Sequence, residues 1–512
     1  MIETAVLTGD DLTVDDVWAV AVDRVPAVLS DESRARMRAA REVVQRAAHG
    51  SREHTYGINT GFGRFVSQSI PEELSEELQV RLLRSHASGV GDPYPDDIVR
   101  AAMLLRANAL AKGYSGARVE TAELLVECLD RGVLPYVPSR GSVGASGDLA
   151  PLAHLALPLI GEGRAWVDGE LCAGEEALAR VGLEPLRLRA KEGLSLVNGT
   201  QFMTAFGALG LIRARRLAKA ADLACALSLE ALQGSRTSFF PQIHMARPLR
   251  GQQDSAANLL RLLEDSSIIE AHRWCDQVQD AYSLRCAPQV HGASRDLLDY
   301  VDYTVSTELN AATDNPLVLV DDDLLVSNGN FHGQSLAFAL DALAMAVSEL
   351  ANIAERRVER LVNPNLSGGL PAFLTTNGGL NSGFMIPQYV AASLVSESKS
   401  LCHPASVDSI PTSAGQEDHV SMGNASGLKA WQVLPNSERV LAIELLAGAQ
   451  GVEFLAPLEP GIGVRATRAF VRKLSPRLRD DRPLADDIET VAAAILDGSL
   501  VEAVEAEVGE LA

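Results

Sequence analysis

The chain has few of the groups that hold metals, cross-link chains or bind polyanions. Its six cysteines include no Cys-x-x-Cys pair, which is typical of reduced thiols in a cytoplasmic protein. Its ten histidines form no His-x-x-x-His or His-Glu-x-x-His pattern, so a metal site is not expected. Lys and Arg (45) are outnumbered by Asp and Glu (67), and the net charge of −22 disfavours nucleic acid and anionic membranes as partners.

Targeting and linker segments are also missing from the pattern. The chain begins Met-Ile-Glu-Thr-Ala without a basic stretch, and Asp341 and Glu349 interrupt its long apolar segments. Neither a signal peptide nor a membrane span is therefore expected. No Pro/Ser-rich linker, charge block or internal repeat divides the 512 residues. We expect one continuous unit with three regions, residues 1–199, 200–465 and 466–512.

Aromatic residues are scarce (5%) although 47% of the residues are hydrophobic, which predicts a core of aliphatic helices. Residues 200–232, 335–361 and 437–452 have helical periodicity, and the first two stretches are longer than usual helices. Two hairpins are expected at the periphery, at residues 166–171 with an Asp-Gly turn and at residues 317–326. The predicted fold is mainly α, a bundle of long helices.

The most informative segment is residues 141–154, GSVGASGDLAPLAH. If the Gly147 amide nitrogen attacks the Ala145 carbonyl carbon and water is lost, including the Ser146 hydroxyl, a five-membered ring with an exocyclic methylidene results. No genetically encoded side chain is a strong electrophile. A ring of this kind would therefore give the protein chemistry that its side chains lack.

The surroundings of this tripeptide suit a strained turn before a helix. Glycines precede it, and glycine adopts backbone conformations that other residues avoid. Asp148 is predicted to be the N-cap of a helix with Pro151 in its first turn, so the positive end of the helix dipole would face the ring. The same tripeptide recurs at residues 87–89 and 425–427 without these surroundings. An ordinary glycine turn is the alternative interpretation.

Polar clusters lie at the predicted ends of the long helices. Taken singly, each is most often a cap or a surface loop, but together they outline a candidate site carried by rigid elements. They are residues 56–63 (YGINTGFG), 84–86 (RSH), 198–201 (NGTQ), 279–285 (QDAYSLR), 330–334 (NFHGQ) and 416–419 (QEDH). The first cluster lacks the last glycine of a dinucleotide loop and any Gly-Lys-Ser/Thr, so a nucleotide site is not expected.

The ordered set of motifs resembles the aromatic amino acid lyase family, and within it the histidine ammonia-lyases. The resemblance runs from about residue 56 to residue 488 and rests on YGxxTGFG, GASGDLAPL, NGTQ, QDxYSLRC, GNFHGQ and QEDHVSMG. It implies a long-helix bundle of the fumarase and aspartase type with small peripheral β-hairpins. It also implies a cytoplasmic homotetramer in which each active site takes loops from three subunits.

The resemblance implies a self-made electrophile and no external cofactor. Ala145, Ser146 and Gly147 match the residues that cyclise to 4-methylidene-imidazol-5-one (MIO). The substrate α-amine, or in another proposal its aromatic ring, would attack this group so that ammonia leaves more easily. Tyr56 matches the general base that removes a β-proton, and Arg285 matches the clamp for the substrate carboxylate.

Further pocket residues are implied in the same way. Asn198 and Tyr282 match groups that orient the amine and stabilise negative charge on the ring, as an oxyanion hole does. Gln279 and Phe331 match other residues that line the pocket.

Two positions bear on the choice of substrate. Family members that take phenylalanine or tyrosine usually have Phe-Leu or His-Leu where this chain has Ser85-His86, and an uncharged amide in place of Glu417. An imidazole offers a donor and an acceptor, and His86 and Glu417 can pair both. The expected reaction converts L-histidine to trans-urocanate and ammonia, the first step of histidine degradation. A phenylalanine or tyrosine ammonia-lyase, or a related aminomutase, is the alternative.

Two other classes are less well supported. The fumarase and aspartase loop, GSSxMPxK, is absent from the chain. A non-catalytic helical scaffold would most naturally have lost Ser146, Tyr56 or Arg285, and all three are present. Ala287 and the region beyond about residue 457 depart from the family pattern, and neither touches the expected chemistry.

Overall fold

The computed structural model describes residues 2–48, 55–144, 146–273 and 278–512, so Ala145 lies outside the described residues. These residues form two compact units, each with its own core. Unit 1 comprises Met1–Ile212, Val301–Asp341 and Pro404–Leu428, and unit 2 comprises Arg213–Tyr300, Ala342–His403 and Lys429–Ala512.

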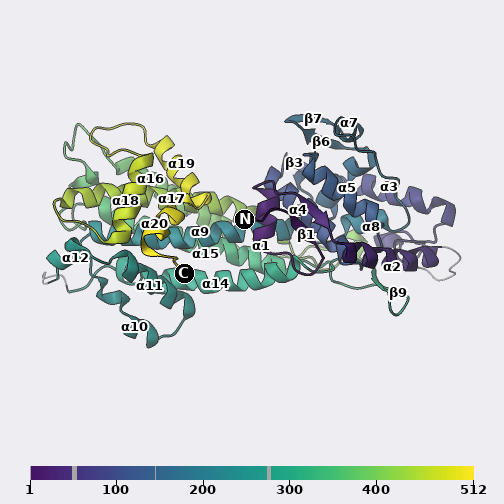
Figure 1. Cartoon of the computed structure of the whole chain (residues 1–512), viewed down its shortest axis with the longest axis horizontal. Coiled ribbons are helices and arrows are strands. Elements are labelled where there is room, and N and C mark those ends of the chain that lie inside the picture. Colours follow the sequence, from purple (N-terminus) through teal and green to yellow (C-terminus); the bar gives the residue numbers. More distant parts are fainter. Residues whose placement is uncertain (1, 49–54, 145, 274–277) are drawn as a thin grey trace. The chain divides into compact units, whose positions relative to one another are not determined.

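Long helices dominate the described chain, which confirms the predicted mainly α fold (Figure 1). They are α9 (Gln201–Ala231), α14 (Ala287–Glu308), α15 (Gln334–Val362) and α17 (Gly423–Val452). The helices expected at residues 200–232 and 335–361 are confirmed as α9 and α15.

The start predicted for the third helix, near Ser437, is wrong because α17 already begins at Gly423 and contains Pro435. Proline normally ends a helix, since it lacks an amide donor. The helix nevertheless continues through Pro435. Within unit 1, a Cβ on Gly427 of α17 would lie 2.6 Å from the Phe206 ring. The missing side chain lets the first turns of α17 lie directly against α9.

Unit 1 contains the shorter helices of the N-terminal half and all the strands of the described chain. Its helices are α1 (Val14–Ala21), α2 (Asp31–Ala48), α3 (Ser75–His86), α4 (Asp96–Ala111), α5 (Val119–Asp130), α6 (Leu149–Ala156), α7 (Gly174–Arg180) and α8 (Glu192–Val197). Its strands are β1 (Ala5–Leu7), β2 (Ala27–Leu29), β3 (Val90–Pro93), β4 (Leu134–Pro135), β5 (Pro138–Arg140), β6 (Arg164–Val167), β7 (Glu170–Ala173), β8 (Leu317–Leu319) and β9 (Leu324–Val326).

Both predicted hairpins are confirmed. Strands β6 and β7 pair antiparallel, with Asp168 (φ 51°) and Gly169 (φ 79°) forming the two-residue turn that matches strand twist. They lie beside α7 at the edge of unit 1 (Figure 1). Strands β8 and β9 also pair antiparallel. The β1–β2 and β3–β5 pairs were not expected, because no short turn joins the paired strands and marks them in the sequence.

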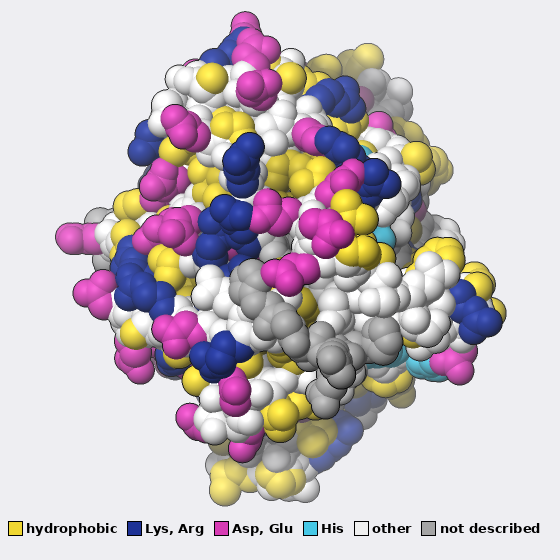
Figure 2. Space-filling view, turned by 90° about the vertical axis from the view of Figure 1, so that its right-hand side faces the viewer, with side chains coloured by type: hydrophobic (Ala, Val, Ile, Leu, Met, Phe, Trp, Pro, Cys, Tyr) yellow, Lys and Arg dark blue, Asp and Glu magenta, His cyan; other side chains and the backbone are white. Residues whose placement is uncertain are grey.

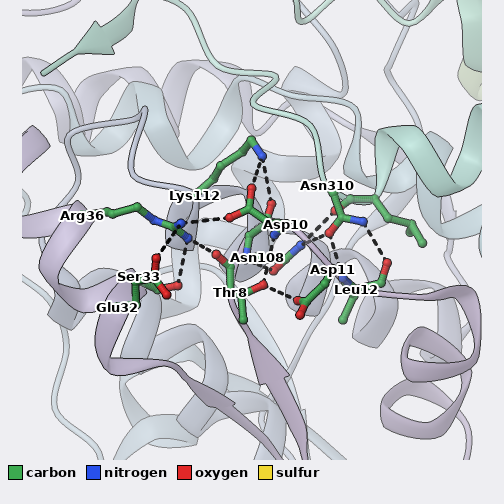
Figure 3. Close-up of polar contacts among 12 residues, drawn as sticks. Thr8, Asp10, Asp11, Leu12, Glu32, Ser33, Arg36, Asn108, Lys112 and Asn310 are labelled. Carbon is green, nitrogen blue, oxygen red and sulfur yellow. Dashed lines mark hydrogen bonds and ion pairs between the residues drawn. The ribbon is translucent and has the colours of Figure 1, made fainter. Parts of the chain in front are cut away.

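The N-terminal segment of unit 1 is tied down by polar contacts (Figure 3). Asp10 pairs with Arg36 of α2 and with Lys112 after α4. Asn310, just beyond α14, accepts from the Leu12 amide and donates to the Leu12 carbonyl, both at 2.9 Å. These contacts fasten the N-terminal segment to the rest of unit 1.

Unit 2 is helical throughout the part that the structure describes. Besides segments of the long helices, it contains α10 (Pro241–Met245), α11 (Arg250–Leu262), α12 (Ser267–Ala271), α13 (Tyr282–Arg285), α16 (Met385–Leu401), α18 (Ile462–Leu474), α19 (Ala485–Leu496) and α20 (Ser499–Val508). Close packing within it uses glycine, because a Cβ on Gly448 of α17 would lie 2.9 Å from Leu227 of α9. Its core is mostly aliphatic, as the composition predicts.

The acidic excess does not produce a uniformly acidic surface. On the face that Figure 2 shows, acidic and basic side chains are interspersed. Exposed ion pairs such as Arg84–Glu162 also occur on the surface. Helix α15 is long and apolar enough to cross a membrane by composition alone, but 72% of its most apolar window is buried inside the protein, as in a core helix.

Candidate active site

The turn that carries the tripeptide is tightly constrained. Ser146 and Gly147 both have positive φ, 49° and 75°. Gly147 forms a parallel bridge with Gly199, and the Asp148 amide donates to the Gly199 carbonyl at 2.6 Å. A Cβ on Gly147 would lie 1.9 Å from that carbonyl oxygen. Only glycine fits here, so the backbone is held against itself at the position where the ring would close.

The preceding part of the turn is anchored by the segment before α17. The Met422 amide donates to the Val143 carbonyl at 2.9 Å, and the Ser421 hydroxyl donates to the Gly144 carbonyl at 3.3 Å. A Cβ on Gly144 would lie 2.0 Å from the Ser421 Oγ. Two segments far apart in the sequence thus fix the shape of the turn.

Asp148 occupies the predicted N-cap position of α6, but its side chain makes no cap there. Its carboxylate instead accepts from the Met203 amide in the first turn of α9 and from the Ser142 hydroxyl, both at 3.0 Å. The first amides of a helix have no acceptor within the helix, and the Asp148 carboxylate supplies one for the Met203 amide of α9. Burial raises the pKa of Asp148 to about 6 although these hydrogen bonds oppose the shift.

A cavity of about 360 Å³ in unit 1 brings several predicted site residues together, and its volume is within the range of small-molecule sites. Ser146 lies at this cavity, and its hydroxyl donates to the Glu417 carboxylate over 3.4 Å. The other Glu417 oxygen accepts from the Thr412 hydroxyl at 2.8 Å. The lining residues are Tyr56, Gly63, Val66, Ser146, Asn315, Ser327, Asn328, Phe331, His332, Gln416, Glu417, Asp418 and His419.

Tyr56 lies half-buried in this cavity, with its ring edge-to-face against Phe62. Its hydroxyl oxygen accepts from the Gly63 amide at 3.4 Å. Burial raises the pKa of Tyr56, the Glu417 charge raises it further, and the Gly63 hydrogen bond only partly opposes them. A general base would need a lowered pKa, which takes nearby positive charge.

His86 lies at the end of α3, with Nδ1 3.0 Å from the Leu82 carbonyl. Burial lowers the pKa of His86, while the Leu82 carbonyl and the charge of Glu417 oppose that shift. A neutral ring that donates from Nδ1 keeps Nε2 as an acceptor. His86 can therefore receive a hydrogen bond from a substrate N–H.

Asn198 is buried at the end of α8. The side-chain amide nitrogen of Asn198 donates to the Asn315 backbone carbonyl at 3.1 Å. The backbone carbonyl of Asn198 accepts from the Arg106 guanidinium at 2.7 Å. Its side-chain oxygen is buried and has no partner within the described ranges. A buried acceptor without a partner suits an N–H donor on a ligand.

Sequence reasoning did not select Asn315, Asn328 or Arg106. Asn315 and Asn328 lie around the β8–β9 hairpin, in segments that look like ordinary turns. Arg106 lies in α4, where its neighbours are apolar and nothing marks it as functional. The turn composition of residues 327–330, SNGN, is a signal that could have located Asn328.

The clusters at residues 330–334 and 416–419 meet in unit 1. Phe331 lines the cavity. The rings of His332 and His419 stack with centroids 5.4 Å apart, and His419 Nδ1 lies 3.3 Å from His332 Nε2. Two histidines therefore border the cavity that contains Glu417.

Gln279, Tyr282 and Arg285 belong to unit 2 and do not line that cavity. The Arg285 guanidinium donates to the Asp280 carbonyl at 3.0 Å and to the Gln279 side-chain oxygen at 3.2 Å. It also lies 4.5 Å above the Tyr282 ring, and 71% of Tyr282 is exposed. The predicted site residues thus form two groups, each ordered within its own unit.

The other two copies of the tripeptide have ordinary roles. Residues 425–427 are part of α17, whose helical backbone keeps the reacting atoms apart. At residues 87–89, Ala87 ends α3 and the Gly89 amide donates to His154 Nε2 at 3.0 Å.

Cysteine and metal ligands add no further site. Free thiols are found at Cys128, Cys172, Cys225, Cys286 and Cys402, and Cys275 lies outside the described residues. Over the part of the chain that the structure describes, no group of three or more His, Cys, Asp or Glu side chains is arranged to hold a metal ion.

Comparisons with known proteins agree with this arrangement. The model of the aromatic amino acid lyase family matches residues 12–474. A histidine ammonia-lyase of Gloeobacter violaceus is 57% identical over 506 residues, which cover 99% of this chain and 98% of the relative. The crystal structure of histidine ammonia-lyase from Trypanosoma cruzi has 46% identity and a TM-score of 0.92, covering 99% of this chain and 96% of that one.

A tyrosine aminomutase from Streptomyces globisporus has a similar fold, with 39% identity and a TM-score of 0.94 over 99% of this chain and 100% of its own. These neighbours confirm the predicted fold class. The chain belongs to the aromatic amino acid lyase family and is an ammonia-lyase, an enzyme that breaks carbon–nitrogen bonds.

Proposed function

We propose that this protein is a histidine ammonia-lyase that eliminates ammonia from L-histidine and releases trans-urocanate, using an MIO group made from Ala145, Ser146 and Gly147. The observation that carries the proposal is that Ser146, Tyr56 and Glu417 border one cavity. The high identity to curated histidine ammonia-lyases over nearly the whole chain supports it.

The residues present fit the MIO group. Gly147 has no Cβ that would clash with the Gly199 carbonyl. The positive φ angles of Ser146 and Gly147 bend the backbone sharply. When formed, the group supplies an electrophile, which no ordinary side chain offers. No external cofactor is needed.

The remaining roles belong to side chains of this protein. Tyr56 removes a β-proton of the substrate, once positive charge near it has lowered the pKa that burial and Glu417 raise. Asn198 orients the substrate amine with its unpartnered side-chain oxygen. Arg285 binds the substrate carboxylate, and Tyr282 stabilises developing negative charge.

Imidazole recognition uses His86 and Glu417. His86 offers an acceptor at Nε2, and Glu417 is a carboxylate acceptor that faces the cavity. A protonated imidazole can donate to both and a neutral imidazole to one of them, whereas a phenyl ring would leave both without partners. Gln279 and Phe331 complete the pocket.

Membership of the aromatic amino acid lyase family leads us to propose a homotetramer in which loops from different subunits complete each site. Mixing two inactive variants tests this. Tyr56→Phe and Arg285→Lys, dissociated and reassembled together, should regain part of the activity, because some sites then combine an intact Tyr56 with an intact Arg285. If mixed assemblies stay inactive, both residues come from the same subunit.

The substrate is tested by incubating the purified protein separately with L-histidine, L-phenylalanine and L-tyrosine. Urocanate absorbs in the near ultraviolet, and ammonia release can be measured independently. We expect activity with L-histidine, whereas turnover of only the other two amino acids would overturn the assignment.

The high structural similarity to a tyrosine aminomutase keeps one alternative with the same chemistry. An aminomutase would form a β-amino acid from tyrosine or phenylalanine without stoichiometric release of ammonia. Product analysis by mass spectrometry separates the two.

The free thiols of the five described cysteines support a cytoplasmic location.

A further inference from the structure

A buried ion pair in unit 2 lies directly behind the segment that carries Tyr282 and Arg285. It joins Arg357 of α15 to Glu444 of α17, and both side chains are fully buried. Arg357 donates from Nε to one carboxylate oxygen of Glu444 and from Nη2 to the other, the latter at 2.8 Å. This two-point contact fixes the plane of the guanidinium.

The remaining nitrogen of this guanidinium points to the substrate-binding segment. Arg357 Nη1 donates to the Ser283 carbonyl oxygen at 3.3 Å. Ser283 lies in α13, immediately after Tyr282 and two residues before Arg285. The ion pair therefore holds the backbone from which both side chains project.

A second buried pair contacts the Nη1 atom of the same guanidinium. His291 of α14 lies with Nδ1 2.7 Å from the Asp222 carboxylate of α9, and its Nε2 is 3.4 Å from Arg357 Nη1. Both contacts are satisfied by a neutral ring that donates from Nδ1 and accepts at Nε2. Ser228 of α9 also donates to Glu444, at 2.6 Å.

The electrostatics favour a permanently charged pair. Burial by itself would lower the pKa of Arg357, but the adjacent Glu444 carboxylate more than offsets this and raises it. Arg357 thus remains a cation, and each of its three side-chain nitrogens has a partner. Such a group resists displacement, because any movement would leave a buried charge without its partner.

Contacts within residues 279–285 link the position of the Ser283 carbonyl to the side chains of Tyr282 and Arg285. Arg285 is held by the Asp280 carbonyl and by Gln279, and it stacks on Tyr282. The Ser235 amide donates to the Asp280 carboxylate at 2.8 Å, which anchors the outer end. The Ser283 carbonyl is the inner anchor, so a shift there would move both Tyr282 and Arg285.

We propose that Arg357 and Glu444 are positioning residues of the reaction, which set Tyr282 and Arg285 at the distance that substrate requires by fixing the Ser283 carbonyl. The proposal rests on the proposed function only in that it takes Tyr282 and Arg285 to bind substrate. Misplacement by about 1 Å can lower a rate on the order of 100-fold, so modest movement of this backbone would be measurable.

The test is Arg357→Lys, with Arg213→Lys as the matched control. Lysine keeps the charge but cannot contact Glu444 and Ser283 in one plane. Arg213 of α9 forms a slightly less buried two-point pair with Glu438 of α17, at 3.0 and 2.9 Å, and its described hydrogen bonds do not reach residues 279–285. Both variants disturb one buried pair of the same bundle.

For each variant we would measure kcat, KM, melting temperature and intact mass. We expect Arg357→Lys to raise KM several-fold and to lower kcat roughly 10- to 100-fold, whereas Arg213→Lys changes each by no more than about twofold at a similar loss of melting temperature. The mass should show loss of two waters in both. Equal effects of the two variants, or an unchanged Arg357→Lys, would overturn the proposal.

If Arg357→Lys does not fold, Glu444→Gln decides, because it keeps the shape of the side chain but removes its charge and one of the two acceptor oxygens that orient the guanidinium. A smaller change in the same direction is expected, and unaltered kinetics would contradict the positioning role. If the unaltered protein acts on none of the three amino acids, the proposed function and the positioning role both fail. If it is active and Glu444→Gln is unaffected, only the positioning role fails.

Discussion

Gly147 and Gly199 lie so close that a Cβ on Gly147 would be 1.9 Å from the Gly199 carbonyl oxygen. Gly147→Ala should therefore prevent ring formation, because the added methyl pushes the amide nitrogen away from its target. Intact mass should be that of the unmodified chain, and activity should be lost. Gly169→Ala is the control, since Gly169 has a similar φ of 79° but no atom within 4 Å of its Cβ position. A dehydrated, active Gly147→Ala variant would contradict the assignment.

Ser146→Ala removes the hydroxyl that leaves as water. We expect no turnover and a mass higher than that predicted by the substitution alone, by the two waters that the unaltered chain loses. Ser426→Ala provides the comparison, because Ser426 belongs to an identical tripeptide inside α17 and should not affect the mass change. Substantial activity in Ser146→Ala would refute the MIO assignment.

Tyr56→Phe should leave the ring intact and lower turnover by roughly 10²- to 10⁴-fold, as loss of a general base does. Intact mass and steady-state kinetics measure the two effects separately. Phe62→Leu removes the ring that packs on Tyr56 without removing the hydroxyl, and it should cost far less. A variant Tyr56→Phe with near-normal turnover would assign the base elsewhere.

Glu417→Gln should lower kcat/KM for L-histidine roughly tenfold to 100-fold, since an imidazole N–H loses a charged acceptor. The loss for L-phenylalanine should be smaller. Asp418→Asn, which removes a neighbouring charge at the same cavity, should affect both substrates alike. Equal losses in Glu417→Gln would mean that Glu417 does not recognise the imidazole.

The same variant has a consequence for pH dependence. The Glu417 charge raises the pKa of Tyr56, so its removal should lower that pKa and move the alkaline rise of kcat/KM to lower pH. Rates measured with a substrate that Glu417→Gln still accepts, over the range from neutral to alkaline pH, test this. An unshifted profile would show that another group limits the rate.

Asp148 makes stability depend on pH. Burial raises its pKa to about 6 from the ordinary 3.8, so the folded protein binds this proton more tightly than the unfolded chain does. The stabilisation is complete below about pH 4 and is lost as the pH rises through about 6, a change of about 3 kcal/mol. Asp148→Asn should flatten the melting temperature over this range. An unchanged slope in the variant would show that other groups cause it.

Much of the architecture could be predicted from local pattern. The long helices α9 and α15 and both hairpins follow from periodicity and from an Asp-Gly turn, which are properties of adjacent residues. The early start of α17 could not be predicted, because Pro435 normally marks a helix boundary, and the close approach of Gly427 to Phe206 joins residues far apart in the sequence. The β1–β2 pair could not be predicted either, since its strands are parallel and no hairpin turn joins them.

The sequence by itself determined the reactive tripeptide, the order of the motifs and therefore the family, because these depend on which residues follow one another. Only the tertiary structure decided which of three identical tripeptides is compressed against Gly199, and that Asp148 caps α9 instead of its own helix. It alone disclosed the Arg357–Glu444 pair behind Ser283. These relationships join residues far apart in the chain, and their energies come from burial and distance, which no local pattern records.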